Sequence, residues 1–150
     1  MSSAFEEARR VFGIESDWLA ATLGLVEESF DRAVDLMGSA GGRLVVSGMG
    51  KSGHIAGKIA ATLTSTGSPA FFLHPAEAVH GDLGLVQLSD VALVLSKSGE
   101  TPEIAALLPC FRRLDVPVVA MTSRPDSTLG RAAAVILRIP DMAEACPHNL

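Results

Sequence analysis

Five short apolar runs recur along this chain and are separated by longer polar or small-residue stretches. Each run is apolar throughout instead of alternating, which is typical of strands buried on both faces of a parallel sheet. The runs cover residues 44–46, 70–73, 91–95, 116–121 and 134–139. Between them we expect helices over 55–66 and 102–114, a short helix or turn within 74–82, and a brief helix after 124–127. This alternation predicts a doubly wound α/β fold with a five-stranded parallel sheet flanked by helices.

A long helix precedes the first strand. Apolar positions recur at helical spacing over residues 4–37, and we expect an interruption near Gly13. The glycine-rich residues 38–42 end this helix. We therefore expect a single domain, in which a helical segment (1–40) precedes an α/β core (41–150). The chain stops soon after the fifth predicted strand, so we expect no closing helix. Either the N-terminal helix or a partner subunit would then cover the sheet face left bare, or the chain is a shortened form of a longer protein.

Composition narrows the function classes. The chain has 150 residues, 48% of them hydrophobic, which is enough for a buried core. Its net charge of -5 argues against nucleic acid or an anionic membrane as partner, so a phosphate ligand would need local donors. No apolar run resembles a signal peptide or reaches the roughly 20 residues of a membrane span, and we expect a cytoplasmic protein. Cys110 and Cys146 lie far apart, which argues against a disulfide framework or a zinc site.

The turn after the third strand carries the strongest chemical signal. Three hydroxyls (Ser96, Ser98 and Thr101) and Gly99 meet there at the start of a helix. Outward-turned N–H groups and the partial positive charge of a helix N-terminus bind anions. The alternative is ordinary helix capping, with Thr101 as the N-cap and Pro102 at the first helical position. Capping leaves Ser96 and Ser98 unexplained, so the pattern favours a phosphate site.

A second glycine-rich turn follows the first strand. Gly48, Gly50 and Gly53 have the spacing of a dinucleotide fingerprint. The acidic residue that such a site needs after the second strand is replaced by His74, which weakens that interpretation. A Walker loop is excluded because Val45 stands where its first glycine should be. A tight turn that only packs a helix against a strand is the structural alternative. In doubly wound folds both turns would lie at the same ligand-binding edge.

Four ordered blocks of this sequence together resemble the sugar isomerase (SIS) domain. They are residues 48–54 (GMGKSGH), 74–84 (HPAEAVHGDLG), 96–101 (SKSGET) and 144–147 (EACP). More closely, the blocks resemble the D-arabinose 5-phosphate isomerases that act in 3-deoxy-D-manno-octulosonate synthesis for lipopolysaccharide. The resemblance runs from about residue 40 to the end of the chain. It implies a SIS-type, flavodoxin-like three-layer sandwich.

The resemblance also implies an activity and a set of residues. The family interconverts D-arabinose 5-phosphate and D-ribulose 5-phosphate through an enediol, without a cofactor or a metal. Its members are typically tetramers with shared active sites, so we expect a homo-oligomer. By position, the substrate-binding group comprises Gly50, Ser52, Gly53, Ser96, Ser98, Gly99 and Thr101, whose four hydroxyls would hold the phosphate. The group around the sugar carbons comprises Lys51, His80, Glu103 and Glu144.

These residue types suit an isomerase. Moving a proton between adjacent carbons needs a base, an acid and stabilisation of the enediolate charge. We expect a carboxylate as base and Lys51 as oxyanion partner, and the sequence leaves the choice between Glu103 and Glu144 open. Each residue has a structural alternative. Glu103 could complement the helix dipole, and His80 could bond to Asp82. Lys97 is given no catalytic role.

The sequence also departs from the family pattern. Isomerases of this family continue with a Ser/Thr-rich segment, a closing helix, a later histidine and usually CBS domains, and none of these is in this sequence. The alternative function is therefore a non-catalytic phosphosugar-binding or regulatory module. A dinucleotide-binding domain is a third, weaker hypothesis. Which sugar phosphate is preferred stays open.

Overall fold

A 35-residue helix, α1 (Ala4–Gly38), begins the fold in the computed structural model, which describes residues 3–146 and 148. Ser3 and Glu6 start it with a reciprocal capping box: Ser3 Oγ accepts from the Glu6 N–H, and Glu6 accepts from the Ser3 N–H. The expected interruption near Gly13 is wrong, since the helix runs through it. A glycine inside a helix costs only about 1 kcal/mol, and the helix-forming residues on both sides outweigh it.

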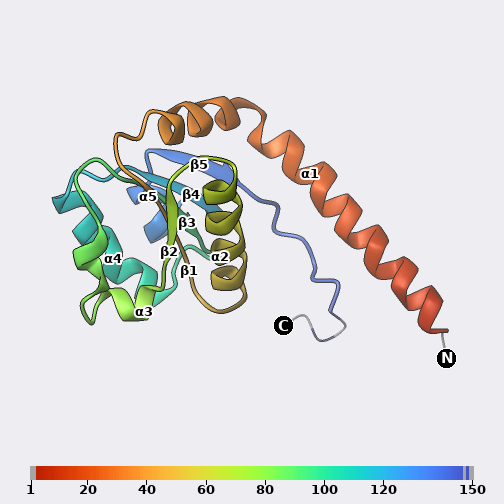
Figure 1. Cartoon of the computed structure of the whole chain (residues 1–150). Coiled ribbons are helices and arrows are strands. Elements are labelled where there is room, and N and C mark those ends of the chain that lie inside the picture. The colour runs from red at the N-terminus through yellow and green to blue at the C-terminus, as the bar shows by residue number, and fades with distance from the viewer. Residues whose placement is uncertain (1–2, 147, 149–150) are drawn as a thin grey trace.

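The remaining strands and helices alternate along the chain (Figure 1). The strands are β1 (Leu44–Gly48), β2 (Ala70–Leu73), β3 (Val91–Leu95), β4 (Val118–Thr122) and β5 (Val135–Arg138). Between them lie α2 (Gly50–Ser65), α3 (Pro75–Ala78), the 3-10 turn η1 (Asp82–Leu85), α4 (Pro102–Arg113) and α5 (Thr128–Ala132). The expected elements are all present. The main difference is that α2 begins five residues earlier than expected, at Gly50, the second glycine of its turn.

The five strands form one parallel sheet in the order β2-β1-β3-β4-β5, which confirms the predicted doubly wound fold. From β1 the chain first adds β2 on one side and then crosses to add β3 on the other side, so the strand order reverses between β1 and β3. These two strands pair in parallel, from Leu44 with Val91 to Gly48 with Leu95. Ligands in such sheets bind beyond the carboxyl ends of the strands at this reversal. The two glycine- and hydroxyl-rich turns, after β1 and after β3, are therefore neighbours.

Two buried clusters fill the space on either side of the sheet. Alternate residues of β3 serve different clusters: Ala92 and Val94 contact the side of α4, whereas Leu93 and Leu95 contact the side of α1 and α2. This division explains why the strands are apolar throughout, because both faces of the sheet are covered. Figure 1 shows α2 and the end of α1 on one side of the sheet, and α3 and α4 on the other.

The end of helix α1 packs against β5, whereas its N-terminal part extends away from the body of the domain (Figure 1). Its N-terminal part is joined to the segment that follows β5. Trp18 Nε1 donates to the Ala143 carbonyl at 3.2 Å, and Arg10 donates to the Ala145 carbonyl at 2.7 Å. The C-terminal segment therefore runs from the sheet edge back along α1.

No helix in the described part is both long and apolar enough to cross a bilayer. Within the same residues, Cys110 and Cys146 are not joined in a disulfide.

Candidate functional site

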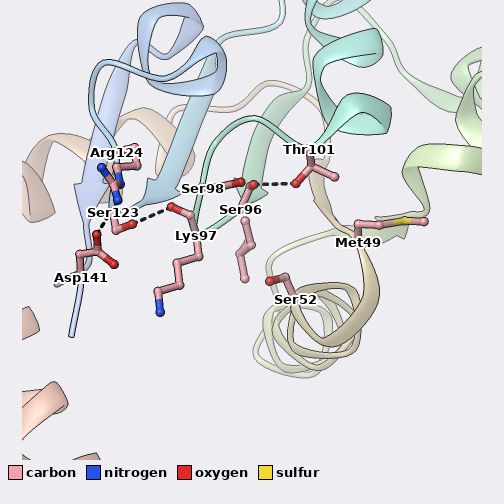
Figure 2. A pocket seen from close by; sticks show the side chains of 10 residues that line it. Met49, Ser52, Ser96, Lys97, Ser98, Thr101, Ser123, Arg124 and Asp141 are labelled. Carbon is pink, nitrogen blue, oxygen red and sulfur yellow. Dashed lines mark hydrogen bonds and ion pairs between the residues drawn. The ribbon is translucent and has the colours of Figure 1, made fainter. Parts of the chain in front are cut away.

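A cavity of about 360 Å³ opens at the carboxyl edge of the sheet (Figure 2). It lies where the turns after β1, β3 and β4 meet the segment after β5. Its lining is mostly hydroxyl-bearing and charged, and consists of Met49, Ser52, Leu95, Ser96, Lys97, Ser98, Thr101, Ser123, Arg124 and Asp141. The four hydroxyls proposed from the sequence as phosphate ligands are all in this lining.

The loop after β3 is held by hydrogen bonds among its own hydroxyls. Ser96 is buried, its Oγ lies 2.9 Å from Thr101 Oγ1, and it accepts from the Gly99 N–H at 3.1 Å. Thr101 is the N-cap of α4 by position, but its side chain makes no capping bond. The capping alternative thus explains the place of Thr101 and not its hydroxyl. The N-terminus of α4 has no side-chain cap to compete with an anion.

Gly99 is required by its backbone and by its neighbours. Its φ of 65° is in the left-handed region, which residues with a Cβ rarely adopt. A Cβ at this position would also lie 1.9 Å from Ser127 Oγ. Ser127 caps α5 by accepting from the Gly130 N–H, so it cannot easily move aside. The sharp turn that brings Ser96 and Ser98 together therefore depends on glycine.

Contacts with the turn after β4 fix the same loop from the other side. The Lys97 carbonyl accepts from Thr122 Oγ1 at 3.0 Å, from the Ser123 N–H at 3.0 Å and from Ser123 Oγ at 2.8 Å. The Glu100 carboxylate accepts from Thr128, and these hydrogen bonds lower the pKa of Glu100. The loop is thus built before any ligand arrives.

The turn after β1 brings a helix close to a strand. A Cβ on Gly48 would lie 2.8 Å from the Ser52 carbonyl oxygen, and one on Gly53 would lie 2.7 Å from the Gly48 carbonyl oxygen. The structural interpretation of these two glycines therefore holds. Gly50 has a φ of 56°, and Met49 is an N-cap without a side-chain bond. This turn directs Ser52 into the cavity, opposite Ser98 (Figure 2).

The residues expected around the sugar carbons do not line this cavity. Lys51 and His80 are exposed, and Glu103 is half-buried in the first turn of α4. Among the described residues no hydrogen bond joins His80 to Asp82, so that structural alternative has no support. Glu144 is ion-paired with Lys97, its Oε1 lying 2.6 Å from Lys97 Nζ. Pro147, the last residue of the fourth sequence block, lies outside the described residues.

Several lining residues were not singled out from the sequence. Ser123 and Arg124 follow β4, and Asp141 follows β5, where its carboxylate forms an ion pair with Arg124 at 2.8 Å. One signal could have found the first two: they come directly after an apolar strand and so belong to the same sheet edge. Arg124 is, with Lys97, one of the two cations in the lining of the cavity. Its ion pair with Asp141 joins the loop after β4 to the C-terminal segment (Figure 2).

Neither a metal nor a dinucleotide is favoured by the described side chains. No group of three or more His, Cys, Asp or Glu residues within residues 3–146 and 148 is arranged to hold a metal ion. His74, which follows β2, has a buried Nδ1 without a hydrogen-bond partner in the described part. An imidazole ring offers at most one acceptor nitrogen, so it cannot accept from ribose hydroxyls through two oxygens as an acidic residue would.

Comparison with known proteins agrees with the sequence blocks. A match to the SIS domain covers residues 37–149. The chain is 50% identical over 143 residues to "Arabinose 5-phosphate isomerase KdsD" of Pseudomonas aeruginosa, and this match covers 95% of the chain. The chain spans only 44% of the length of that relative.

Two solved structures share the fold. The Escherichia coli CFT073 protein c3406, solved in complex with arabinose 5-phosphate, is 35% identical with a TM-score of 0.85, over 99% of this chain and 81% of that one. A Listeria monocytogenes protein is 27% identical with a TM-score of 0.94, over 100% of this chain and 80% of that one. Sequence blocks, strand order and the hydroxyl-lined edge all lead to the same assignment: this chain belongs to the SIS domain family.

Proposed function

We propose that this chain is an aldose–ketose isomerase domain that interconverts D-arabinose 5-phosphate and D-ribulose 5-phosphate. The observation that carries the proposal is the cavity of Ser52, Ser96, Ser98 and Thr101 at the uncapped N-terminus of α4. The P. aeruginosa relative is an arabinose 5-phosphate isomerase, and the E. coli CFT073 structure holds arabinose 5-phosphate. Both support a pentose phosphate as the ligand.

In this proposal the phosphate lies among the four hydroxyls. The α4 N-terminus and Arg124 contribute positive potential, which the net charge of the whole chain does not. The sugar then extends from the cavity toward its rim. Binding by several donors would fix the sugar carbons relative to the protein, which is the main requirement for a proton transfer between C1 and C2.

The proton transfer itself is assigned, from the family resemblance, to residues outside the lining of this cavity. A carboxylate, Glu103 or Glu144, takes the proton from one carbon and returns it to the next, and no cofactor is needed. Lys51 stabilises the negative charge on the enediolate oxygen, and His80 hydrogen-bonds to the sugar hydroxyls. Gly50, Gly53 and Gly99 shape the two turns. These roles rest on the family resemblance and on the placement of the turns at one sheet edge.

We further propose that the chain is a homo-oligomer. Seven large apolar side chains of α1 are exposed, and all but Leu25 lie seven or four residues from the next: Phe5, Phe12, Leu19, Leu23, Phe30 and Val34. This spacing puts them on one face of the helix. A second copy of this chain is the proposed occupant, because two such helices can bury equal apolar faces around a two-fold axis.

The domain organisation and location belong to the same proposal. We propose one SIS domain, with residues 1–40 as its helical segment and 41–150 as its α/β core. We propose a cytoplasmic location, where sugar phosphates are available to a protein that has no membrane-spanning helix in its described part.

The experiment is proton NMR of the purified protein with D-arabinose 5-phosphate in deuterated buffer. Formation of D-ribulose 5-phosphate, with deuterium entering at C1 or C2, would support the isomerase. Exchange without net product would still demonstrate a working base. Ligand line-broadening without either signal would contradict the isomerase.

One observation favours a second candidate, a non-catalytic phosphosugar-binding module. Lys51, His80 and Glu103 do not line the hydroxyl cavity, whereas the proposed phosphate ligands do. A binding module would need only the latter. The same NMR experiment separates the two functions, because a binding module would broaden the sugar signals and leave their protons in place.

A further inference from the structure

Lys97 stands where three distant parts of the chain meet. Its Nζ lies 2.6 Å from Glu144 Oε1 in the C-terminal segment and 5.0 Å from the centre of the Trp18 ring in α1. We infer that Lys97 is a positioning residue that holds Glu144 beside the hydroxyl cavity. This inference rests on the isomerase function proposed above. Trp18 in turn holds both partners in place.

The backbone of Lys97 is fixed independently of its side chain. Its carbonyl accepts three hydrogen bonds from Thr122 and Ser123, at 2.8 to 3.0 Å. Its neighbours in the chain are the cavity residues Ser96 and Ser98. The ammonium group is therefore carried by a rigid loop that is itself part of the proposed phosphate site. Any group bound by this ammonium has a defined place relative to the phosphate.

Trp18 completes the arrangement from the side of α1. Its ring lies under the Lys97 ammonium, a favourable cation–π placement. Its Nε1 donates at 3.2 Å to the carbonyl of Ala143, the residue before Glu144. One aromatic side chain therefore contacts both the cation and the backbone next to the carboxylate, so it restrains the relative position of Lys97 and Glu144.

Lys97 also lines two cavities. One is the hydroxyl cavity, and the other, of about 490 Å³, is lined by Trp18, Glu144 and neighbouring residues of α1. Figure 2 shows the Lys97 side chain pointing away from Ser98 and Thr101. Its ammonium thus faces the carboxylate instead of the phosphate loop. The ion pair is 39% and 37% exposed at its two side chains, and a pair so exposed contributes little to stability. The role of the ion pair would be to fix the position of the Glu144 carboxylate.

The test combines kinetics with the fluorescence of Trp18, the single tryptophan of the chain. The variants are Lys97→Met, Lys97→Arg, Glu144→Gln and the double variant Lys97→Met/Glu144→Gln. Lys58→Met, an exposed lysine of α2, is the matched control. Acrylamide quenching reports whether Trp18 stays covered, and isomerisation of D-arabinose 5-phosphate reports kcat and KM.

Lys97→Met should lower kcat about 10- to 100-fold with little change in KM, because a misplaced catalytic group loses rate more than binding. Lys97→Arg should restore most of that loss. In the Glu144→Gln background Lys97→Met should cost nothing further, since its effect passes through Glu144. Trp18 should become more accessible to acrylamide in Lys97→Met and stay unchanged in Lys58→Met.

The opposing outcomes are distinct. A raised KM at unchanged kcat would overturn the inference and show that Lys97 binds the substrate phosphate. Multiplicative losses in the double variant, or no change in Trp18 quenching, would also overturn it. Absence of turnover in the unmodified chain would instead overturn the proposed isomerase, and with it the catalytic purpose of Lys97. The quenching result would then still decide whether the three-residue contact exists in solution.

Discussion

Glu100 and Thr128 form a two-point contact between the loop after β3 and the start of α5. The carboxylate accepts from the Thr128 N–H at 2.8 Å and from Thr128 Oγ1 at 2.7 Å. Both bonds favour the ionised carboxylate, and they hold the pKa of Glu100 below its ordinary value. The contact closes the proposed phosphate loop against the neighbouring turn, so its protonation connects pH to the shape of the site.

The first prediction concerns stability against pH. A carboxylate whose pKa is lowered on folding stabilises the protein above its unfolded-state pKa, and that contribution is lost as pH falls through the lowered value. Glu100→Gln should therefore melt below the unmodified protein at pH 7, and the difference should shrink in acid. Glu28→Gln, an exposed carboxylate of α1, is the control. A difference that stays constant between neutral and acid pH would contradict the assignment.

The second prediction concerns Gly99. Gly99→Ala places a Cβ against Ser127 in a left-handed backbone, and we expect a loss in the free energy of unfolding above the roughly 1–2 kcal/mol of the backbone cost alone. Gly57→Ala is the matched control, because nothing lies within 4 Å of its added Cβ in α2. It should raise stability by about 0.5–1 kcal/mol. Urea unfolding measures both, and equal behaviour of the two variants would refute the requirement for glycine at 99.

The third prediction tests the phosphate site. Ser98→Ala removes an exposed hydroxyl from the cavity lining, and binding of D-arabinose 5-phosphate should weaken by about 1–3 kcal/mol. Ser65→Ala, at the far end of α2, should bind as the unmodified protein does. Isothermal titration calorimetry gives both affinities. Unchanged affinity in Ser98→Ala would move the phosphate away from the loop after β3.

The fourth prediction addresses the proposed base. Glu103→Gln and Glu144→Gln each preserve shape and remove a carboxylate, and loss of the base should lower kcat about 10²- to 10⁴-fold. Glu77→Gln, an exposed glutamate of α3, serves as the control. Deuterium exchange at C1 and C2 identifies which variant has lost proton transfer. If both variants keep full exchange, neither carboxylate is the base.

The fifth prediction concerns the apolar face of α1. Leu19 and Leu23 are 74% and 73% exposed at the centre of that face. The unmodified chain should be larger than a monomer by light scattering, and Leu19→Lys/Leu23→Lys should reduce its mass. Glu28→Lys, on another face of the same helix, should not. A monomeric unmodified chain would rule out the second copy as the occupant.

The sheet could be predicted from sequence because its strands are apolar on both faces, and short apolar runs that alternate with helices are typical of parallel sheets. The same logic placed Ser52 and Ser98 at one edge, since both follow parallel strands whose carboxyl ends share that edge. Only the observed strand order makes the two strands neighbours. Gly13 shows the limit of local signals. A single glycine predicts a break, but the helix-forming residues around it decide the outcome.

Other features depended on contacts between distant residues. Thr101 stands at the N-cap position that the sequence predicts, yet its hydroxyl contacts the buried Ser96 hydroxyl instead of a backbone N–H of α4. The sequence does not reveal that Ser96 lies within reach. Arg124 enters the cavity only because β4 pairs beside β3. The ion pair of Lys97 with Glu144 joins positions 47 residues apart, and no spacing rule would have brought them together.

The pairing of β3 between β1 and β4 has a consequence for how the site could be lost. Ser96 follows the last paired residue of β3, and its N–H donates to the Met121 carbonyl at 3.0 Å. Side chains alternate between faces along a strand, so sliding β3 by one residue would turn the Ser96 hydroxyl to the opposite side of the sheet. An apolar strand could tolerate such a slip with much of its burial intact. Ligand affinity would therefore report strand alignment more sharply than a melting curve does.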